Sequence, residues 1–306
     1  MEYDNTGDAI VKRLLFIFNP QSGKARIRGQ LFEIVEFYTN AGYLVTVYPT
    51  SATGDAYAFL TALEEEYDLI VCSGGDGTLN EVVAGLLDSR NKTPLGYIPS
   101  GSTNDFGRSV GIPTELGMAL EISCAGNLRK LDIGRLNDRY FVYVAAFGAF
   151  TRVSYVTSQK MKNALGHLAY LLQGIKELSE LHPYELAVRY EGGEITGKYI
   201  VGLIMNSFSI GGFKNPVGAL TELNDGVFEV ILIKMPQNVL ELQGVIAALL
   251  GEPRDSEHIV CFQTSRMEIQ SEMMEWTVDG EYGGRFEQVT VENHHSAIEI
   301  VTGIGE

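Results

Sequence analysis

Residues 68–87 read DLIVCSGGDGTLNEVVAGLL, and this stretch decides the fold. Leu69–Cys72 is a short apolar run that ends at glycines, a pattern typical of a buried parallel strand. The residues that follow carry apolar side chains at helical spacing: Leu79, Val82, Val83, Leu86 and Leu87. The stretch therefore predicts a strand, a glycine turn and a helix.

The glycine turn between this strand and this helix favours an anion. Gly74, Gly75 and Gly77 surround Asp76, so backbone N–H groups can approach a ligand closely at a helix N-terminus. Phosphate is the expected guest, and a divalent cation between the phosphate and Asp76 would make the carboxylate favourable there. The alternative is a tight turn in which Asp76 only caps the helix.

The totals restrict the class of protein. A chain of 306 residues with 45% hydrophobic residues is long enough for two domains with a large core. Its net charge of −16 argues against nucleic-acid binding and against broad adhesion to anionic lipid, so we expect any membrane contact to be local.

The cysteines and the hydropathy pattern predict a cytoplasmic protein that is soluble or peripheral to a membrane. Cys72, Cys124 and Cys261 are odd in number and widely spaced, so neither a disulfide framework nor a zinc site is indicated. Apolar runs are all much shorter than a membrane span.

Strands and helices alternate in the first third of the chain. Residues 14–18 and 43–48 read as strands, and helices are expected from about 28 to 40 and from Gly54–Asp55 to Glu66. This alternation predicts a parallel sheet covered on both faces. The first strand runs into Asn19-Pro20-Gln21-Ser22-Gly23-Lys24, a small-residue turn at the sheet edge where such folds bind ligands.

A second loop of the same kind follows a strand at 94–98. It reads PSGSTNDFGR from Pro99 to Arg108, and its hydroxyls and glycine can contact phosphate. Asp105 adds a second carboxylate at the same sheet edge. The alternative is a surface loop in which Asn104-Asp105 caps the next helix.

From about Asp132 the pattern predicts an antiparallel β-rich second domain, either a sandwich or an open barrel. The expected strands are 140–146, 184–190, 199–205, 227–233, 258–263, 267–270, 276–278 and 289–291. A helix is expected at about 158–181, packed against this domain; the alternative is that it faces lipid through Met161 and Leu165.

Two acidic turns stand out in the second domain. Asp225 lies in Leu-Asn-Asp-Gly, an ordinary turn sequence whose carboxylate could also bind magnesium or calcium. Asp279-Gly280 alone would be a hairpin turn. Glu281 follows it among further glycines, which favours its presentation to a ligand.

Taken together, five motifs closely resemble the soluble bacterial diacylglycerol kinases, in the lipid kinase family related to sphingosine kinases. They are NPQSGKA, SGGDGTLNEVVAGL, PSGSTNDFGRSVGIP, LNDG and VDGEYGG, in this order between Asn19 and Gly284. The resemblance implies an α/β nucleotide-binding domain at residues 1–132. It implies a β-rich lipid-substrate domain at 133–306, whose C-terminal end can return to the first domain.

The resemblance also implies roles for particular residues. ATP contacts would come from Asn19, Pro20, Gln21, Ser22, Gly23, Thr50, Gly74, Gly75, Asp76, Gly77, Thr78, Leu79, Asn80 and Ser102. A magnesium site apart from the nucleotide would use Asp225 and the backbone carbonyls of Glu222 and Val227. Glu281 would accept the substrate proton, while Asp76 and Asp105 would hold catalytic magnesium and the phosphates.

The expected reaction is transfer of the ATP γ-phosphate to diacylglycerol at the inner face of the membrane, giving phosphatidic acid. Phosphatidylglycerol, undecaprenol and sphingoid lipids are alternatives that the motifs do not separate. NAD kinase also uses GGDG, although Asn19-Pro20 and Asp279-Gly280-Glu281 favour the lipid branch. A nucleotide-binding regulator without turnover ranks last because Asp76 and Glu281 are both present. An exposed strand edge would permit a homodimer.

Overall fold

The computed structural model describes residues 11–90, 92–101, 104–148, 169, 172, 181–206, 209–210, 213–214, 224–250 and 256–303. The chain divides into two compact units: unit 1 comprises Met1–Leu131 with Ala297–Glu306, and unit 2 comprises Asp132–Ser296. The backbone therefore passes between the units twice, once in strand β5 (Asn127–Leu136) and once in strand β15 (Glu281–Thr302).

Unit 1 is a parallel α/β structure, as the alternating sequence pattern predicts. Its sheet has the order β2-β1-β3-β4, and Ile300 near the end of β15 pairs in parallel with Leu95 of β4. The elements are β1 (Lys12–Phe18), the 3-10 helix η1 (Ser22–Ala25), α1 (Arg26–Asn40), β2 (Tyr43–Pro49), α2 (Asp55–Thr61), β3 (Leu69–Gly74), α3 (Asp76–Asp88), β4 (Leu95–Pro99), α4 (Asp105–Ser109) and α5 (Leu116–Ala125).

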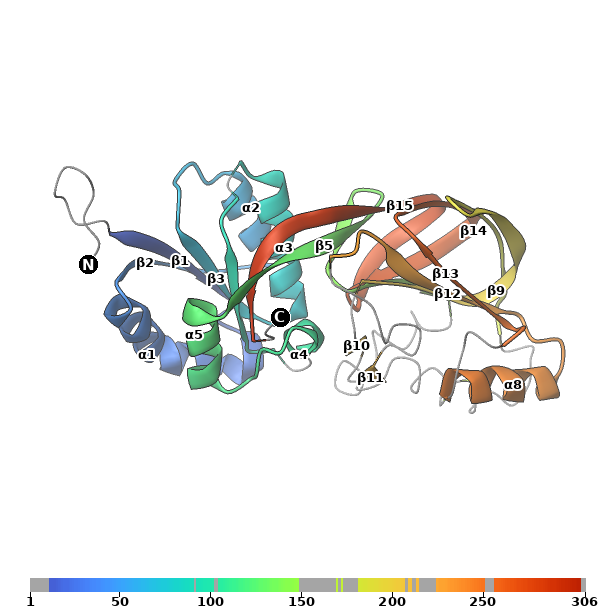
Figure 1. Cartoon of the computed structure of the whole chain (residues 1–306), viewed down its shortest axis with the longest axis horizontal. Helices are drawn as coiled ribbons and strands as arrows, with labels where there is room; N and C mark the ends of the chain where they lie inside the picture. Colours follow the sequence, from blue (N-terminus) through green and yellow to red (C-terminus); the bar gives the residue numbers. More distant parts are fainter. Residues whose placement is uncertain are drawn as a thin grey trace. The chain divides into compact units, whose positions relative to one another are not determined.

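The core of unit 1 lies around its two central strands. All six residues of β3 are buried, and so is β1 from Leu14 to Phe18, because helices cover both faces of a parallel sheet. Helices α1 and α5 lie on one face, and α2 and α3 lie on the other (Figure 1). The hydroxyls of Tyr38 in α1 and Ser123 in α5 lie 2.6 Å apart and join the first pair of helices.

Helix α2 is shorter than the sequence pattern predicts, because it ends at Thr61 and not at Glu66. The carboxylate of Glu65 accepts hydrogen bonds from the Arg13 side chain at 2.8 Å and from the Tyr67 hydroxyl at 3.0 Å. These partners lie on and beside the sheet. Glu64, Glu65 and Glu66 would place negative charge at the negative end of a longer helix, and the chain instead turns toward β3.

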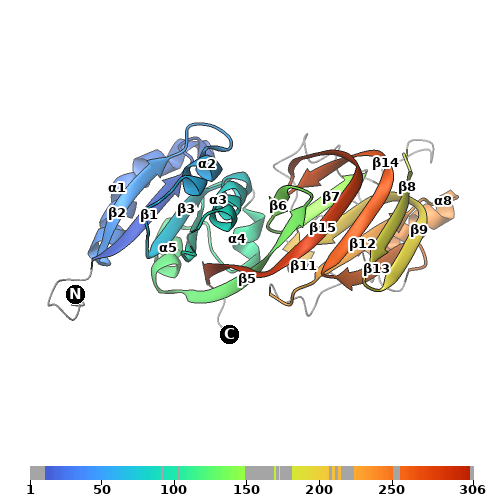
Figure 2. The same ribbon diagram turned by 90° about the horizontal axis from the view of Figure 1, so that it is seen from above.

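Unit 2 is an antiparallel β-rich structure, again as predicted. Its strands have the order β13-β12-β9-β7-β14-β15, and β8 pairs with both β9 and β14 (Figure 2). The further elements are β6 (Arg139–Phe141), β7 (Val144–Gly148), β8 (Tyr184–Tyr190), β9 (Gly193–Met205), β10 (Ser209–Ile210), β11 (Phe213–Lys214), β12 (Phe228–Lys234), α8 (Val239–Leu250), β13 (Ile259–Thr264) and β14 (Arg266–Val278).

The core of unit 2 contains the inward side chains of these strands. Along β14, Met267 and Ile269 are buried while Glu268 and Gln270 are exposed, which is the period-two pattern of a strand with one solvated face. Trp276 is fully buried, and its ring packs edge-on against Phe147 with centroids 5.0 Å apart.

The strands predicted at 267–270, 276–278 and 289–291 are too short. The strands expected at 267–270 and 276–278 are the two halves of β14, separated by an irregular register between Gln270 and Met274 that interrupts the apolar alternation. The strand expected at 289–291 is the middle of β15, which runs for 22 residues. Its polar stretch at 292–296 hides this continuity because it offers no apolar alternation.

The helix predicted at about 158–181, with Met161 and Leu165, lies outside the described residues except at Ala169, Leu172 and Leu181. Ala169 and Leu172 are helical and buried. Throughout the ranges that the structure describes, no helix is both long and apolar enough to cross a membrane.

Candidate functional site

The loops that carry the predicted nucleotide contacts are tied together at the carboxyl edge of the unit 1 sheet. The backbone N–H of Asn19 donates to the carbonyl of Ser73 at 2.9 Å, and that of Ser100 donates to the carbonyl of Gly74 at 2.9 Å. The N–H of Thr50 donates to the carbonyl of Phe18 at 2.9 Å. The loops after β1, β2 and β4 are thus each fixed to a neighbouring strand end, and two of these ends belong to β3.

Glycine is required where these loops touch. A Cβ on Gly101 would lie 2.4 Å from the Cα of Gly75, and one on Gly23 would lie 2.2 Å from the carbonyl oxygen of Ser100. Gly23 also has a φ of 55°, which favours glycine. The glycines predicted to let a phosphate approach the backbone therefore also let three loops approach one another.

Asp76 is the first residue of α3, and the N-cap is Gly75, so the alternative of Asp76 as a capping residue is wrong. One carboxylate oxygen of Asp76 lies 3.4 Å from the backbone N–H of Phe106 in α4, which brings the GGDG turn beside the second loop. A partly buried carboxylate at a helix N-terminus, next to glycine N–H groups, suits a metal-bound phosphate.

The side chain of Asn19 shapes the first loop. Its Oδ1 accepts from the N–H of Gln21 at 2.8 Å, and its Nδ2 lies 3.4 Å from Oγ1 of Thr78 on α3. Leu79 is 1% exposed, so its side chain belongs to the core and only its backbone can reach a nucleotide. Asn80 is partly exposed.

In the second loop, Asn104 binds its own loop and does not cap α4 through its side chain. It stands at the N-cap with a φ of 53°, and its amide exchanges two hydrogen bonds of 2.8 Å with the backbone N–H and carbonyl of Gly101. The predicted contact Ser102 lies outside the described residues, and for Asp105 the structure describes only the backbone, as the first residue of α4.

The loop after β2, which carries Thr50, is fixed by two carboxylates. Asp55 accepts from the N–H of Ser51 at 2.6 Å, from the hydroxyl of Ser51 at 2.8 Å and from the hydroxyl of Tyr48 at 2.8 Å. These bonds, the one from the Ser51 backbone foremost, lower the pKa of Asp55. Glu81 of α3 accepts from the N–H of Gly54 at 2.7 Å and joins this loop to the GGDG helix.

A hollow of about 370 Å³ opens beside these loops in unit 1. Its lining includes the buried apolar side chains of Ile27 and Ile98 and the polar residues Ser22, Asn104 and Arg108. Such a mixture of apolar surface and a few polar groups is what a small-molecule site offers.

In unit 2, Glu281 is the exposed first residue of β15, directly after a two-residue hairpin turn. Val278 pairs with Glu281, and the turn residues Asp279 and Gly280 have φ values of 49° and 84°. Gly283 is an extra residue on β15, because Thr277 pairs with Tyr282 and Trp276 with Gly284. The glycines around Glu281 are thus explained by a tight turn and a β-bulge, devices that often re-aim side chains near sites.

The turn that carries Asp225 is exposed, and one carboxylate oxygen of Asp225 accepts from the N–H of Val227 at 3.0 Å. A carboxylate has capacity for further bonds, and Mg²⁺ usually takes one or two carboxylates and keeps several waters. An exposed carboxylate such as that of Asp225 is the kind of ligand that a partly hydrated Mg²⁺ takes. Glu222 lies outside the described residues, and within those ranges no three His, Cys, Asp or Glu side chains form a metal cluster.

Asp132 is a buried residue of this region that the motifs do not single out. Its carboxylate accepts from the backbone N–H groups of Gly226 and Ser296, both at 2.6 Å, and lies 3.0 Å from Nδ1 of His295. It therefore anchors the Asp225 turn. The sequence does carry a signal for this residue, because Asp132 stands between the apolar residues Leu131 and Ile133. An acid buried in such a place needs a partner for its carboxylate.

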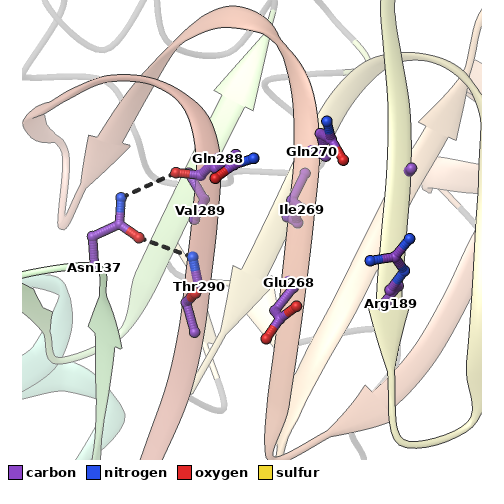
Figure 3. Close-up of a pocket in the computed structure, with 9 residues that line it drawn as sticks. Asn137, Arg189, Glu268, Ile269, Gln270, Gln288, Val289 and Thr290 are labelled. Carbon is purple, nitrogen blue, oxygen red and sulfur yellow. Dashed lines mark hydrogen bonds between the residues drawn. The ribbon is translucent and has the colours of Figure 1, made fainter.

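A second hollow, of about 320 Å³, lies in unit 2 over strands β8, β14 and β15 (Figure 3). Its lining includes Arg189, Glu268, Gln270 and Gln288, and Asn137 bonds the backbone of β15 beside it. None of the predicted site residues lines it, and this polar surface does not suit an acyl chain.

Comparison with known proteins covers nearly all of the chain. Residues 13–136 match the diacylglycerol kinase catalytic domain, and residues 144–302 match the YegS C-terminal NAD kinase beta sandwich-like domain. A diacylglycerol kinase of Bacillus subtilis is 37% identical over 277 residues, which cover 90% of this chain and 91% of that protein. One from Staphylococcus aureus is 36% identical, covering 90% and 87%.

The fold is also that of a solved structure. A crystal structure of a diacylglycerol kinase from Bacillus anthracis superposes with a TM-score of 0.78 at 20% identity, covering 96% of this chain and 98% of that one. With both domain models matched in order, and with curated relatives more than one-third identical over nine-tenths of its length, the chain belongs to the diacylglycerol kinase family.

Proposed function

We propose that this protein is an ATP-dependent lipid kinase that phosphorylates diacylglycerol to give phosphatidic acid. The observation that carries the proposal is the GGDG turn, in a chain whose curated relatives over nine-tenths of its length are named diacylglycerol kinases. The turn places Asp76 and the N-terminus of α3 beside loops from three neighbouring strands, an arrangement suited to a triphosphate.

In the proposed reaction the lipid hydroxyl oxygen forms a bond to the γ-phosphorus as the bond from that phosphorus to ADP breaks. Glu281 accepts the hydroxyl proton, and Asp76 and Asp105 hold the metal and the phosphates in line. Magnesium, when bound, neutralises the charge of the triphosphate. Asp225, with the backbone carbonyls of Glu222 and Val227, is proposed to hold a second, separate magnesium ion.

The nucleotide contacts remain those implied by the motifs: Asn19, Pro20, Gln21, Ser22, Gly23, Thr50, Gly74, Gly75, Asp76, Gly77, Thr78, Leu79, Asn80 and Ser102. Support comes from the packing of the loops that carry them, since Gly23 touches the loop at Ser100 and Gly75 touches Gly101. The lipid substrate requires access to a bilayer, so we propose peripheral binding at the inner face of the membrane. A homodimer is compatible with the exposed strand edge of β2.

The test is a kinase assay in mixed micelles that offers diacylglycerol, phosphatidylglycerol, undecaprenol or a sphingoid base, with labelled ATP. NAD without lipid forms a further arm, because residues 144–302 match a domain described as similar to that of NAD kinase. We expect label in phosphatidic acid, lost when EDTA removes magnesium. Label in NADP, or in another lipid at a higher kcat/KM, would assign a different substrate.

A further inference from the structure

We propose that Asp279 is a positioning residue for Glu281. Its buried carboxylate fastens the hairpin turn between β14 and β15 onto the backbone at residues 142–144, and this attachment sets where Glu281 stands. The inference rests on the proposed function, in which Glu281 accepts the proton of the lipid hydroxyl.

The backbone conformation of this hairpin turn is common, but the burial of its Asp279 side chain is unusual. Asp279 and Gly280 are the only residues between the paired Val278 and Glu281, and both have positive φ, as a type I′ turn requires. Asp-Gly is a preferred sequence for such a turn, which normally lies at the surface. Asp279 is only 5% exposed, so its side chain has been taken into the protein.

The carboxylate of Asp279 binds three consecutive backbone N–H groups. One oxygen accepts from Val142 at 2.8 Å, and the other accepts from Tyr143 and Val144, both at 3.0 Å. Successive N–H groups that point to one side form a concavity that binds anions. Here the anion is supplied by the turn itself, through charge-assisted hydrogen bonds that are stronger than neutral ones.

The main chain of the turn is attached to the same segment. The N–H of Asp279 donates to the carbonyl of Val144 at 2.8 Å, and the buried hydroxyl of Tyr143 donates to the carbonyl of Asp279 at 2.9 Å. Next to it, Val278 pairs with Ala145 of β7. Five hydrogen bonds therefore hold one residue of a two-residue turn.

Glu281 begins β15 two residues after Asp279, so its backbone position follows that of the turn. A proton acceptor must stand within hydrogen-bond reach of the group it deprotonates, and a misplacement of about 1 Å can cost roughly 100-fold in rate. The oxygens of Asp279 are engaged by backbone amides in a buried position, which suits a residue that acts through Glu281 and not on the substrate.

The experiment compares Asp279→Asn, Glu281→Gln and the double variant. Asparagine has the size of aspartate, but its amide group would face a backbone N–H. We expect Asp279→Asn to lower kcat on diacylglycerol by about 100-fold, with the KM for ATP and the affinity for a fluorescent ATP analogue within about twofold of wild type. In the double variant we expect a kcat within about threefold of Glu281→Gln alone, because a positioning residue has no effect once its partner is gone.

Tyr143→Phe is the milder variant, and it keeps the test decisive if Asp279→Asn does not fold. It removes only the hydrogen bond to the turn carbonyl, and we expect kcat to fall several-fold in the wild type and not to change in the Glu281→Gln background. Tyr190→Phe, the same change on β8, is the matched control and should keep wild-type kcat.

The outcomes are distinct. A wild-type kcat for folded Asp279→Asn overturns the inference. If Asp279→Asn does not fold, a wild-type kcat for Tyr143→Phe overturns it. The inference is also overturned if the double variant shows the product of the two single losses in kcat. In each of these cases the proposed function stands. A wild-type kcat for Glu281→Gln overturns the proton-acceptor role and the inference with it.

Discussion

At the scale of single residues, unit 2 contains two pairs of carboxylates with opposite environments. Asp132 and Asp279 are buried and accept hydrogen bonds from backbone N–H groups. Asp225 and Glu281 are exposed on the turns that the buried pair holds. A buried carboxylate is stable only when such donors surround it. The buried acids thus fix the backbone of the turns that carry the two exposed acids.

Glu281→Gln tests the proton-acceptor role directly. Glutamine keeps the size of the side chain but cannot take up a proton, so we expect kcat to fall by about 100- to 10,000-fold. The affinity for ATP should change little, and it can be measured by titration calorimetry with a non-hydrolysable ATP analogue. An unaltered kcat would show that another group accepts the proton.

Asp132→Asn should destabilise the fold. Its amide group would face the N–H of Gly226 or of Ser296, and an unsatisfied buried donor costs about 1–3 kcal/mol of unfolding free energy. Urea unfolding followed by circular dichroism measures the change. Asp138→Asn is the matched control on an exposed turn, and we expect it to stay within about 0.5 kcal/mol of wild type.

Asp55 should make stability depend on pH at the acid end. Its pKa in the folded protein is lowered, first by the N–H of Ser51 and then by the hydroxyls of Tyr48 and Ser51. Its contribution is therefore complete above the pKa of the unfolded chain, about 3.9, and is lost as the pH falls through the lower folded value. The stability difference between wild type and Asp55→Asn should shrink between pH 7 and pH 2 in urea melts. A difference that is constant over this range would contradict the assignment.

At the scale of elements, the strongly periodic segments are the ones that the sequence predicts. The apolar run before the glycines of β3 and the helical spacing in α3 are local signals, and both elements are confirmed. The length of β15 was not predictable, because the strand pairs with its hairpin neighbour β14 only along its first half and then continues to Ile300, which pairs with Leu95 of β4 about 200 positions earlier in the chain. Packing between distant segments leaves no local pattern.

The partners of the buried acids were hidden for the same reason. Asp279 was recognised within a hairpin turn, yet the residues that bind its carboxylate lie more than 130 positions earlier in the chain. Asp132 binds residues 94 and 164 positions away. The motifs thus identify which residues are candidates for the site, whereas the supporting hydrogen bonds appear only in the folded chain.

The contact between the loops after β1 and β4 predicts the effect of Gly23→Ala. The new methyl group would lie 2.2 Å from the carbonyl oxygen of Ser100, so the two loops must separate. We expect the affinity for ATP to fall at least 10-fold, measured with a fluorescent analogue. Gly42→Ala is the matched control, because Gly42 also has positive φ but has nothing within 4 Å of its added Cβ. Gly42→Ala should lose roughly 1 kcal/mol of stability through its positive φ alone. Gly23→Ala should lose more because of the added clash, and it alone should bind ATP less tightly.

At the scale of the whole molecule, the order of the two folds is readable from the sequence, since alternating strands and helices give way to strands alone. The return of the chain to unit 1 cannot be read from the local sequence pattern, because it depends on which strands pair. Residues 297–306 belong to unit 1, where Ile300 pairs with Leu95 of β4. Unit 1 is therefore made of two pieces of chain.

Deletion of residues 297–306 should destabilise unit 1, although it removes no predicted site residue. The edge of β4 would lose its parallel neighbour and become an unpaired edge, which promotes aggregation. We expect a lower urea midpoint and faster cleavage of unit 1 by a protease at low concentration. Deletion of residues 304–306 alone is the control and should leave both unchanged.

The double passage of the backbone has a consequence during synthesis. A ribosome releases residues 12–125 long before residues 297–302 exist, so the first-made part must wait without its last strand while all of the inserted unit is translated. Nascent domains usually complete themselves in order, from the N-terminus onward. Here the part translated first is completed last. Until residues 297–302 are made, the open edge of the unit 1 sheet can be bound by a chaperone that shields such edges.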